Sequence, residues 1–292
     1  MIGARHNHTK RKLTAAAAAL ASLLVATGLS ACSGGAAAGG DTLKKSGSSA
    51  AVVVGVCPGP YGDMVTEVIA PLLKDKGYRV TTKLFNDYVQ PNKALSSGSI
   101  QADLFQHINY LNTFAADNHL ALTSLGQVPT LGLGIYSHRY TKLSQIPEGA
   151  TVAIASDPSN LARSLEVLRQ NRLITIKSGV QDTKATVDDI ASNPRKLAIK
   201  TLDAAQLPRS LDSVDVSLIP GNFSWSAGLK PSQALAFERQ SSGVINVFVV
   251  RTADVHTSFA RDVKALLASN RFKQAIATSK FADFGKPTTW QS

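Results

Sequence analysis

The segments Phe85-Asn-Asp-Tyr88-Val-Gln-Pro-Asn92 and Phe105-Gln-His107-Ile-Asn-Tyr110-Leu decide the fold class expected for this chain. Each follows a run that predicts a strand and leads into a stretch that predicts a helix. Open α/β sheets bind small ligands at such strand-to-helix turns. Aromatic rings and a histidine therefore stand where a ligand site is expected. No acid–base pair or nucleophile accompanies them, so the pattern favours holding a small zwitterion over transforming it.

Apolar runs alternate with amphipathic stretches along the chain. The β-branched run at 51–56 predicts a buried strand, and 63–76 predicts a helix with one apolar face, which Pro71 would kink. Further strands are expected at 79–85, 102–105, 151–155, 197–201, 214–219 and 244–251, and further helices at 92–97, 109–117, 161–172, 186–192, 204–211 and 258–269. This rhythm predicts an α/β protein with two lobes, each a mainly parallel sheet flanked by helices.

The sequence predicts four parts. Residues 1–32 form a signal peptide, 33–50 a flexible linker, 51–136 a first lobe to which 247–292 returns, and 137–246 a second lobe. The chain is expected to cross between the lobes near Ser137 and to return near Asn246.

The first 32 residues have the pattern of a lipoprotein signal peptide. A basic start precedes an alanine-rich apolar run, which ends at Leu29-Ser-Ala-Cys32, the pattern that bacterial lipoprotein signal peptidase cleaves. A transmembrane anchor is the alternative, but it requires about 20 apolar residues and matching flanks. Lipidation at Cys32 would hold the protein on the extracytoplasmic face of the cell membrane.

The chain carries a net charge of +11, and four of these charges lie before Cys32, so seven remain after cleavage. Its Lys and Arg residues are scattered rather than gathered in a stripe, so the charge does not indicate nucleic-acid binding. A moderate excess of this size favours contact with anionic lipid or wall polymer.

Arg163 is the candidate for binding a carboxylate. It lies about one turn into the helix that follows Asp157-Pro-Ser-Asn160, and a helix N-terminus with an adjacent guanidinium suits an anionic group. The alternative is a solvated Arg163 on an exposed face, with Ser159 or Asn160 as a simple cap. Composition alone favours this alternative.

The aromatic residues Tyr88, Phe105 and Tyr110 could line an apolar slot, in which a thioether side chain would be favoured. Aromatic residues after strands are more often part of the core. His107 would point to the same side as Phe105. Asn246 begins the returning strand, and its amide can donate and accept, as an amino-acid head group requires.

Several long motifs in the same order resemble the NLPA family, the methionine-binding lipoproteins that feed ABC importers. The resemblance runs from about Val52 to Phe272. Besides the opening segments, it rests on Gly55-Val-Cys-Pro-Gly-Pro60, Asp157-Pro-Ser-Asn160 with Arg163, Leu202-Asp-Ala-Ala-Gln-Leu-Pro-Arg209 and Asn246. It implies a two-lobe periplasmic-binding-protein-like fold of type II, with methionine held in the cleft and delivered to an ABC permease and its ATPase.

The resemblance also implies the roles of individual residues. Tyr88, Phe105, His107 and Tyr110 would form the side-chain pocket; Asn160 and Arg163 would bind the carboxylate; and Asn246 would contact the polar head group. The family commonly has Ile-Asn-Gly-Asn-Tyr where this chain has Ile219-Pro-Gly-Asn-Phe223. Pro220 thus replaces an asparagine expected to touch the ligand.

Two other functions remain open at this point. The Pro220 change could mark another amino acid, a small peptide, or a surface lipoprotein with an adhesin-like role. A hydrolase is disfavoured because the sequence has no G-x-S-x-G, H-E-x-x-H or P-loop motif and no paired-cysteine metal spacing. We expect a binding protein without catalytic residues, metal or cofactor.

Overall fold

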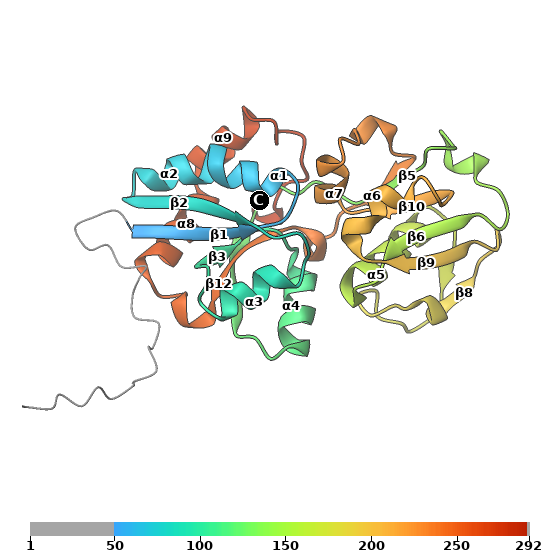
Figure 1. Ribbon diagram of the computed structural model, residues 1–292, viewed down its shortest axis with the longest axis horizontal. Helices are drawn as coiled ribbons and strands as arrows, with labels where there is room; N and C mark the ends of the chain where they lie inside the picture. The colour runs from blue at the N-terminus through green and yellow to red at the C-terminus, as the bar shows by residue number, and fades with distance from the viewer. Residues whose placement is uncertain (1–49, 291–292) are drawn as a thin grey trace, which may run out of the picture. The chain divides into compact units, whose positions relative to one another are not determined.

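The structure is a computed structural model that describes residues 50–290. Within this range the chain forms two five-stranded sheets and a small hairpin, with helices packed against the sheets (Figure 1). This confirms the expected α/β class.

The first sheet has the strand order β2-β1-β3-β12-β4. Strand β1 pairs in parallel with β2 and β3, whereas β12 runs antiparallel to β3 and β4. Strand β12 is therefore the one antiparallel strand of an otherwise parallel sheet. The bounds are β1 Ala50–Val56, β2 Tyr78–Leu84, β3 Ala102–Asp103, β4 Leu122–Gln127 and β12 Val247–Arg251.

The second sheet has the order β11-β5-β10-β6-β9 and the same character. Strand β6 is parallel to β9 and β10, and β5 is the reversed strand. The bounds are β5 Gly134–Tyr136, β6 Thr151–Ala155, β9 Ala198–Leu202, β10 Val216–Ile219 and β11 Ala236–Phe237. Each lobe is thus a mainly parallel sheet, as the sequence predicts.

The main helices are α1 Pro60–Asp63, α2 Ala70–Lys74, α3 Gln90–Ser96, α4 Ile108–Asp117, α5 Pro158–Gln170, α6 Leu207–Ser210, α7 Gly221–Ser226, α8 Ser258–Ala268 and α9 Asn270–Ala277. Each of α4, α5, α8 and α9 begins with a side chain that accepts a backbone N–H at its N-cap. Such caps satisfy donors that have no partner within the helix.

Pro71 lies inside a continuous helical stretch, because the turn before it is wider than an α-turn. Residues Met64–Ile69 form a π-helical segment, and the N–H of Ala70 bonds to the carbonyl of Val65, five residues earlier. This change of hydrogen-bond register comes directly before the residue that has no N–H to donate.

The helix predicted at 186–192 is wrong. Thr186 caps a single 3₁₀ turn, Val187–Asp189, and the Asp189 carboxylate accepts from the N–H and hydroxyl of Thr186. The turn ends there, and β8, Ile190–Ser192, pairs with β7, Thr175–Ile176. Local side-chain bonds to the backbone compete successfully with helix propagation here.

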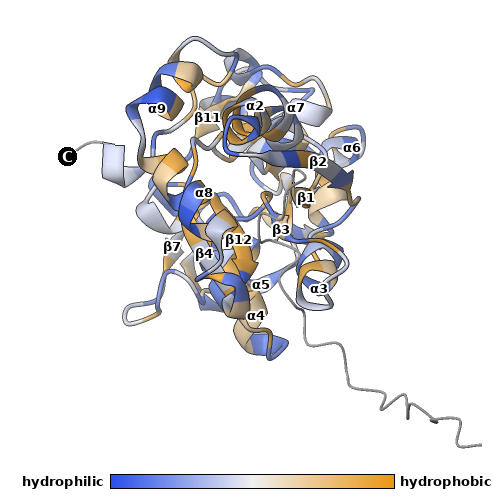
Figure 2. Ribbon diagram, turned by 90° about the vertical axis from the view of Figure 1, so that its left-hand side faces the viewer, coloured by the Kyte–Doolittle hydropathy of each residue, from blue (hydrophilic) through white to orange (hydrophobic). Residues whose placement is uncertain are grey.

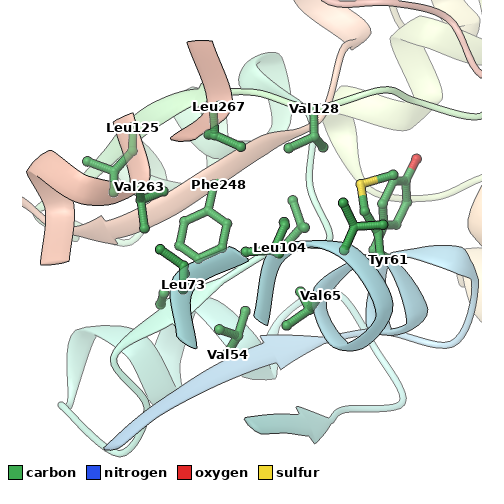
Figure 3. Packing of buried hydrophobic residues seen from close by; sticks show 14 of the residues in the cluster. Val54, Tyr61, Val65, Leu73, Leu104, Leu125, Val128, Phe248, Val263 and Leu267 are labelled. Atoms are coloured by element: carbon green, nitrogen blue, oxygen red, sulfur yellow. The ribbon is translucent and has the colours of Figure 1, made fainter. Parts of the chain in front are cut away.

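The first lobe packs around the side chain of Phe248, which is fully buried between β12 and helix α8. Figure 3 shows Phe248 facing Val263 and Leu267 of α8, with Val54 of β1 and Leu73 of α2 on its other side. Strand β12 is hydrophobic along most of its length (Figure 2). This strand, far from β1 in sequence, therefore completes the lobe formed mainly by the first part of the chain.

Two segments run side by side where the chain passes between the sheets. The N–H of Val128 bonds to the carbonyl of Asn246, and the N–H of Glu238 bonds to the carbonyl of Leu133. Thr130 also pairs with Gly285 near the C-terminus. This paired crossing, 128–133 with 238–246, positions residues of both lobes around one cavity. The lobe boundaries at 136 and 246 stay predictions.

Within residues 50–290, none of the helices has the length and apolar content that crossing a membrane requires. Cys32 and the signal peptide lie outside the described residues. Cys57, the other cysteine, is a buried free thiol, as expected for a structural residue at the end of an apolar strand.

Replacing Phe248 by alanine should lower the free energy of unfolding by about 3–5 kcal/mol, because it removes a ring from the centre of the packed core. The matched control is Leu84→Ala, whose side chain is 62% exposed and should change stability by less than about 0.5 kcal/mol. Urea unfolding measures both. Equal effects of the two substitutions would contradict this packing.

Candidate functional site

A cavity lies between the two lobes. It sits where the chain leaves the carboxyl ends of β1, β3 and β6, the position expected for a ligand site in an α/β sheet. Its walls include every binding residue predicted from the sequence: Tyr88, Phe105, His107, Tyr110, Asn160, Arg163 and Asn246. The structure brings all seven together, and their binding role stays a prediction.

Three rings form an aromatic wall on the first lobe. The ring centroid of Tyr88 lies 5.8 Å from that of Phe105 and 5.6 Å from that of Tyr110, and Phe223 of α7 adds a fourth ring at 5.1 Å from Tyr88. The Tyr110 hydroxyl donates to the backbone carbonyl of Tyr88 at 3.0 Å. Burial raises the pKa of both tyrosines, so their hydroxyls stay neutral donors.

Tyr88 also reaches across to the second lobe. Its hydroxyl donates to Asn222 Oδ1 at 2.6 Å, and Asn222 Nδ2 donates to the carbonyl of Pro58 at 3.0 Å. Asn222 thereby holds two segments of the first lobe. A polar residue in a short helix gave no signal for this role.

His107 is the N-cap of α4. Its Nδ1 accepts the N–H of Tyr110 at 3.1 Å, so the ring proton is assigned to Nε2, which donates to Asn160 Oδ1 at 3.1 Å. Burial, and then the charge of Arg163, lower the pKa of His107 to about 3. The imidazole is therefore neutral and links α4 of the first lobe to α5 of the second.

Arg163 is buried, so the exposed position that composition favours is wrong. Its side chain is 8% exposed, and Glu238 accepts hydrogen bonds from both Nε, at 2.8 Å, and Nη2. Burial alone would lower the pKa of Arg163, but Glu238 outweighs this effect and raises it. The guanidinium is a permanent cation at the cavity wall.

The edge of Arg163 expected to clasp a ligand carboxylate is thus held by Glu238. The remaining terminal nitrogen, Nη1, donates to Asn160 Oδ1 at 3.4 Å. Nη1, which Glu238 does not contact, is therefore the nitrogen of Arg163 at which a ligand carboxylate would bind. Glu238 itself escaped prediction because a single acid beside Arg239 has no distinguishing pattern.

Asp157, rather than Ser159 or Asn160, caps helix α5. Its carboxylate accepts from the backbone N–H of Asn160 at 2.9 Å and from Asn160 Nδ2. The side-chain amide of Asn160 is therefore oriented with Oδ1 toward His107 and Arg163. Burial raises the pKa of Asp157, and the hydrogen bonds from Asn160 partly offset this.

Asn246 lies directly before β12, on the returning segment. Its backbone N–H donates to Thr130 Oγ1 at 2.8 Å, and its Nδ2 donates to the carbonyl of Phe105 at 3.1 Å. It also forms a bridge with His107. The residue thus connects the crossing segment to the aromatic wall.

The cavity has further walls that the sequence did not single out as a site: Tyr61, Gln106, Thr130, Leu131, Gly221 and Asn222. Gln106 lies between two predicted residues and is fixed by Asn92 and Asp103. Pro220 also lines the cavity and offers no hydrogen-bond donor there. Among residues 50–290, no group of three or more His, Cys, Asp or Glu side chains could hold a metal ion.

A family model and individual relatives of known name place the chain among the same group of lipoproteins. Residues 52–288 match the family described as NlpA lipoprotein. A Vibrio cholerae protein named probable D-methionine-binding lipoprotein MetQ is 37% identical over 227 residues, which is 77% of this chain and 83% of that protein. The D-methionine-binding lipoprotein MetQ of Escherichia coli K12 is 39% identical over 202 residues, covering 68% of this chain and 74% of that protein.

Solved structures agree with the sequence comparison. A nutrient binding protein from Burkholderia cenocepacia, solved bound to methionine, superposes with a TM-score of 0.73 at 36% identity. The match covers 80% of this chain and 97% of that one. The chain belongs to the NlpA lipoprotein family, which confirms the resemblance and the two-lobe fold.

The neutral state of His107 predicts a pH dependence of stability. Its pKa is about 3 in the folded protein and about 6.5 when unfolded. Between these values the unfolded chain binds a proton that the folded protein does not. Stability is therefore fully present above the unfolded pKa and falls as the pH drops below it, by up to about 1.4 kcal/mol per pH unit.

His107→Asn is the matched control, since asparagine also caps helices but does not titrate. Urea unfolding from pH 7 to pH 4 should show wild type losing stability relative to this variant, while carboxylates such as Asp103 contribute equally to both. A difference that stays constant over this range would contradict the assignment.

Proposed function

We propose that the chain is a lipid-anchored, extracytoplasmic solute-binding protein that captures an amino acid, methionine, and delivers it to an ABC importer. The observation that carries the proposal is the cavity between the lobes, which one buried guanidinium and a set of aromatic rings line together. The chain acts as a binding protein and not as an enzyme, in keeping with its family.

The aromatic wall suits the side chain of methionine. A thioether is apolar and polarisable, and sulfur–aromatic contacts add about 0.3–1.5 kcal/mol to its burial. The rings of Tyr88, Phe105 and Tyr110 pack against one another and present one apolar surface for such a chain. A charged side chain would lose its hydration there without a partner.

The opposite side of the cavity suits the α-carboxylate and the ammonium group. Arg163 Nη1 and Asn160 would bind the carboxylate, and Asn246 would contact the head group. The methionine-bound relative from Burkholderia cenocepacia and the MetQ proteins of Vibrio cholerae and Escherichia coli support this ligand class. The relatives' names include D-methionine, so both enantiomers belong in the test.

The lipid anchor and the partners follow from the family and the sequence. Lipidation at Cys32 and the linker 33–50 would tether the binding lobes outside the membrane. A membrane permease with its ATPase would receive the ligand when the lobes separate. The lobe boundaries proposed from the sequence, 51–136 with 247–292 and 137–246, fit this movement.

Titration with amino acids tests the proposal directly. Isothermal titration should give a dissociation constant near or below 1 μM for methionine, about 8 kcal/mol of binding free energy. In thermal melts against each amino acid and D-methionine, a ligand at about 100 times its dissociation constant adds about 2.7 kcal/mol of stability. A response to another amino acid alone would assign a changed ligand, and no response at all would contradict the proposal.

Arg163→Gln should weaken methionine binding by about 2–4 kcal/mol, because it removes the cation that holds the carboxylate. The variant also leaves Glu238 buried without its partner, so circular dichroism must confirm that it is folded. The control is Arg169→Gln on the same helix, where the exposed arginine pairs with Glu166 away from the cavity. A folded Arg163→Gln variant with wild-type affinity would refute this role.

A further inference from the structure

Glu238 is a buried acid on the crossing segment, and the sequence gave no reason to expect it near the site. Its side chain is 3% exposed. Oε2 accepts from Arg163 Nε at 2.8 Å, and Oε1 accepts from Arg163 Nη2 and from the N–H of Leu133 at 2.9 Å. The carboxylate is therefore fixed by three donors.

The fold makes room for this carboxylate. A Cβ at Gly132 would come within 3.3 Å of Glu238 Oε1 and 3.4 Å of its Cγ, so a larger residue at that position would press on the acid. Glu238 lines a second cavity behind Arg163, and His107 and Arg163 border both cavities. The acid thus lies on the far side of the guanidinium from the predicted ligand.

The charges around the ligand cavity balance. Of the described residues that line it, Arg163 carries the one permanent charge, and His107 is neutral. Asp157 lies nearby, but it caps the positive end of helix α5. Glu166 and Asp182, on the second cavity, both pair with Arg169 near the surface. Glu238 is therefore the counter-charge of Arg163.

We infer that Glu238 is a specificity-determining residue, which cancels the charge of Arg163 so that the cavity accepts zwitterions and rejects anions. The inference rests on the proposed function. A carboxylate at Arg163 Nη1 faces a second carboxylate across one guanidinium, and the ammonium group of an amino acid offsets this repulsion. An analogue with the carboxylate alone has no such compensation.

An unpaired arginine would behave differently. A lone buried guanidinium attracts any carboxylate, with or without an ammonium group, so it would bind organic acids as well as amino acids. Glu238 weakens the attraction of Arg163 for carboxylates, and in return the site distinguishes amino acids from acids that lack an ammonium group. Glu238 should therefore change the ratio of the affinity for an amino acid to the affinity for the same acid without its ammonium group. A purely structural role would not change this ratio.

The test compares methionine with 4-(methylthio)butanoate, which has hydrogen in place of the ammonium group. Isothermal titration measures both compounds on wild type, Glu238→Gln, Glu238→Asp and the control Glu166→Gln. Wild type should prefer methionine by about 100-fold or more. Glu238→Gln should lower this preference by about tenfold, or 1.4 kcal/mol. Glu238→Asp keeps the charge, so it and Glu166→Gln should keep the preference within about threefold.

The inference is overturned if Glu238→Gln keeps the wild-type preference, or if Glu238→Asp loses as much of it. Wild type also provides a test without substitution, because a preference below about tenfold overturns the inference even if Glu238→Gln does not fold. Wild type that binds neither compound refutes the proposed function itself, whereas methionine binding with an unchanged ratio refutes the inference alone.

Discussion

The guanidinium of Arg163 is buried between the lobes, and a buried cation is stable only where opposite charge and hydrogen bonds replace its lost hydration. Glu238 supplies both, from the segment that carries the chain back to the first lobe. The pair thereby joins helix α5 to the crossing segment. Asn160, one turn before Arg163 on the same helix, is oriented by Asp157 and reaches both Arg163 and His107. The ion pair therefore fixes the charged side chain of the cavity wall relative to the crossing segment.

The lobes also meet through hydrogen bonds between neutral side chains. Tyr88 donates to Asn222, and His107 donates to Asn160, each across the cavity. Burial keeps both donors neutral, since it raises the pKa of Tyr88 and lowers that of His107. Each such bond contributes about 1 kcal/mol net. A ligand shifts the balance between separated and closed lobes only by its difference in affinity for the two arrangements, so contacts with both lobes at once would favour the closed one.

The sequence predicted correctly those strands and helices that are determined by runs of neighbouring residues. The β-branched run of β1 and the strand-loop-helix pattern from β6 to α5 lie where expected. The error at 186–192 arose because side-chain bonds from Asp189 end the helix after one turn. The family motifs indicated seven residues that the fold brings together. They could not reveal Glu238, because its pairing with Arg163 joins residues 75 positions apart and leaves no periodic trace.

Pro220 stands at the cavity wall where the family motif has an asparagine. Pro220 is the N-cap residue of α7, and a Cβ at Gly221 would collide with the carbonyl of Leu131, so the start of this helix is pressed against the crossing segment. No side-chain amide stands at position 220, and Asn222 is committed to Tyr88 and Pro58. Fewer amides are therefore available to a ligand's head group than the family motif implies. If Arg163 and Glu238 select the ligand by charge as proposed, their balance would take a larger share in that selection, because position 220 supplies no further donor.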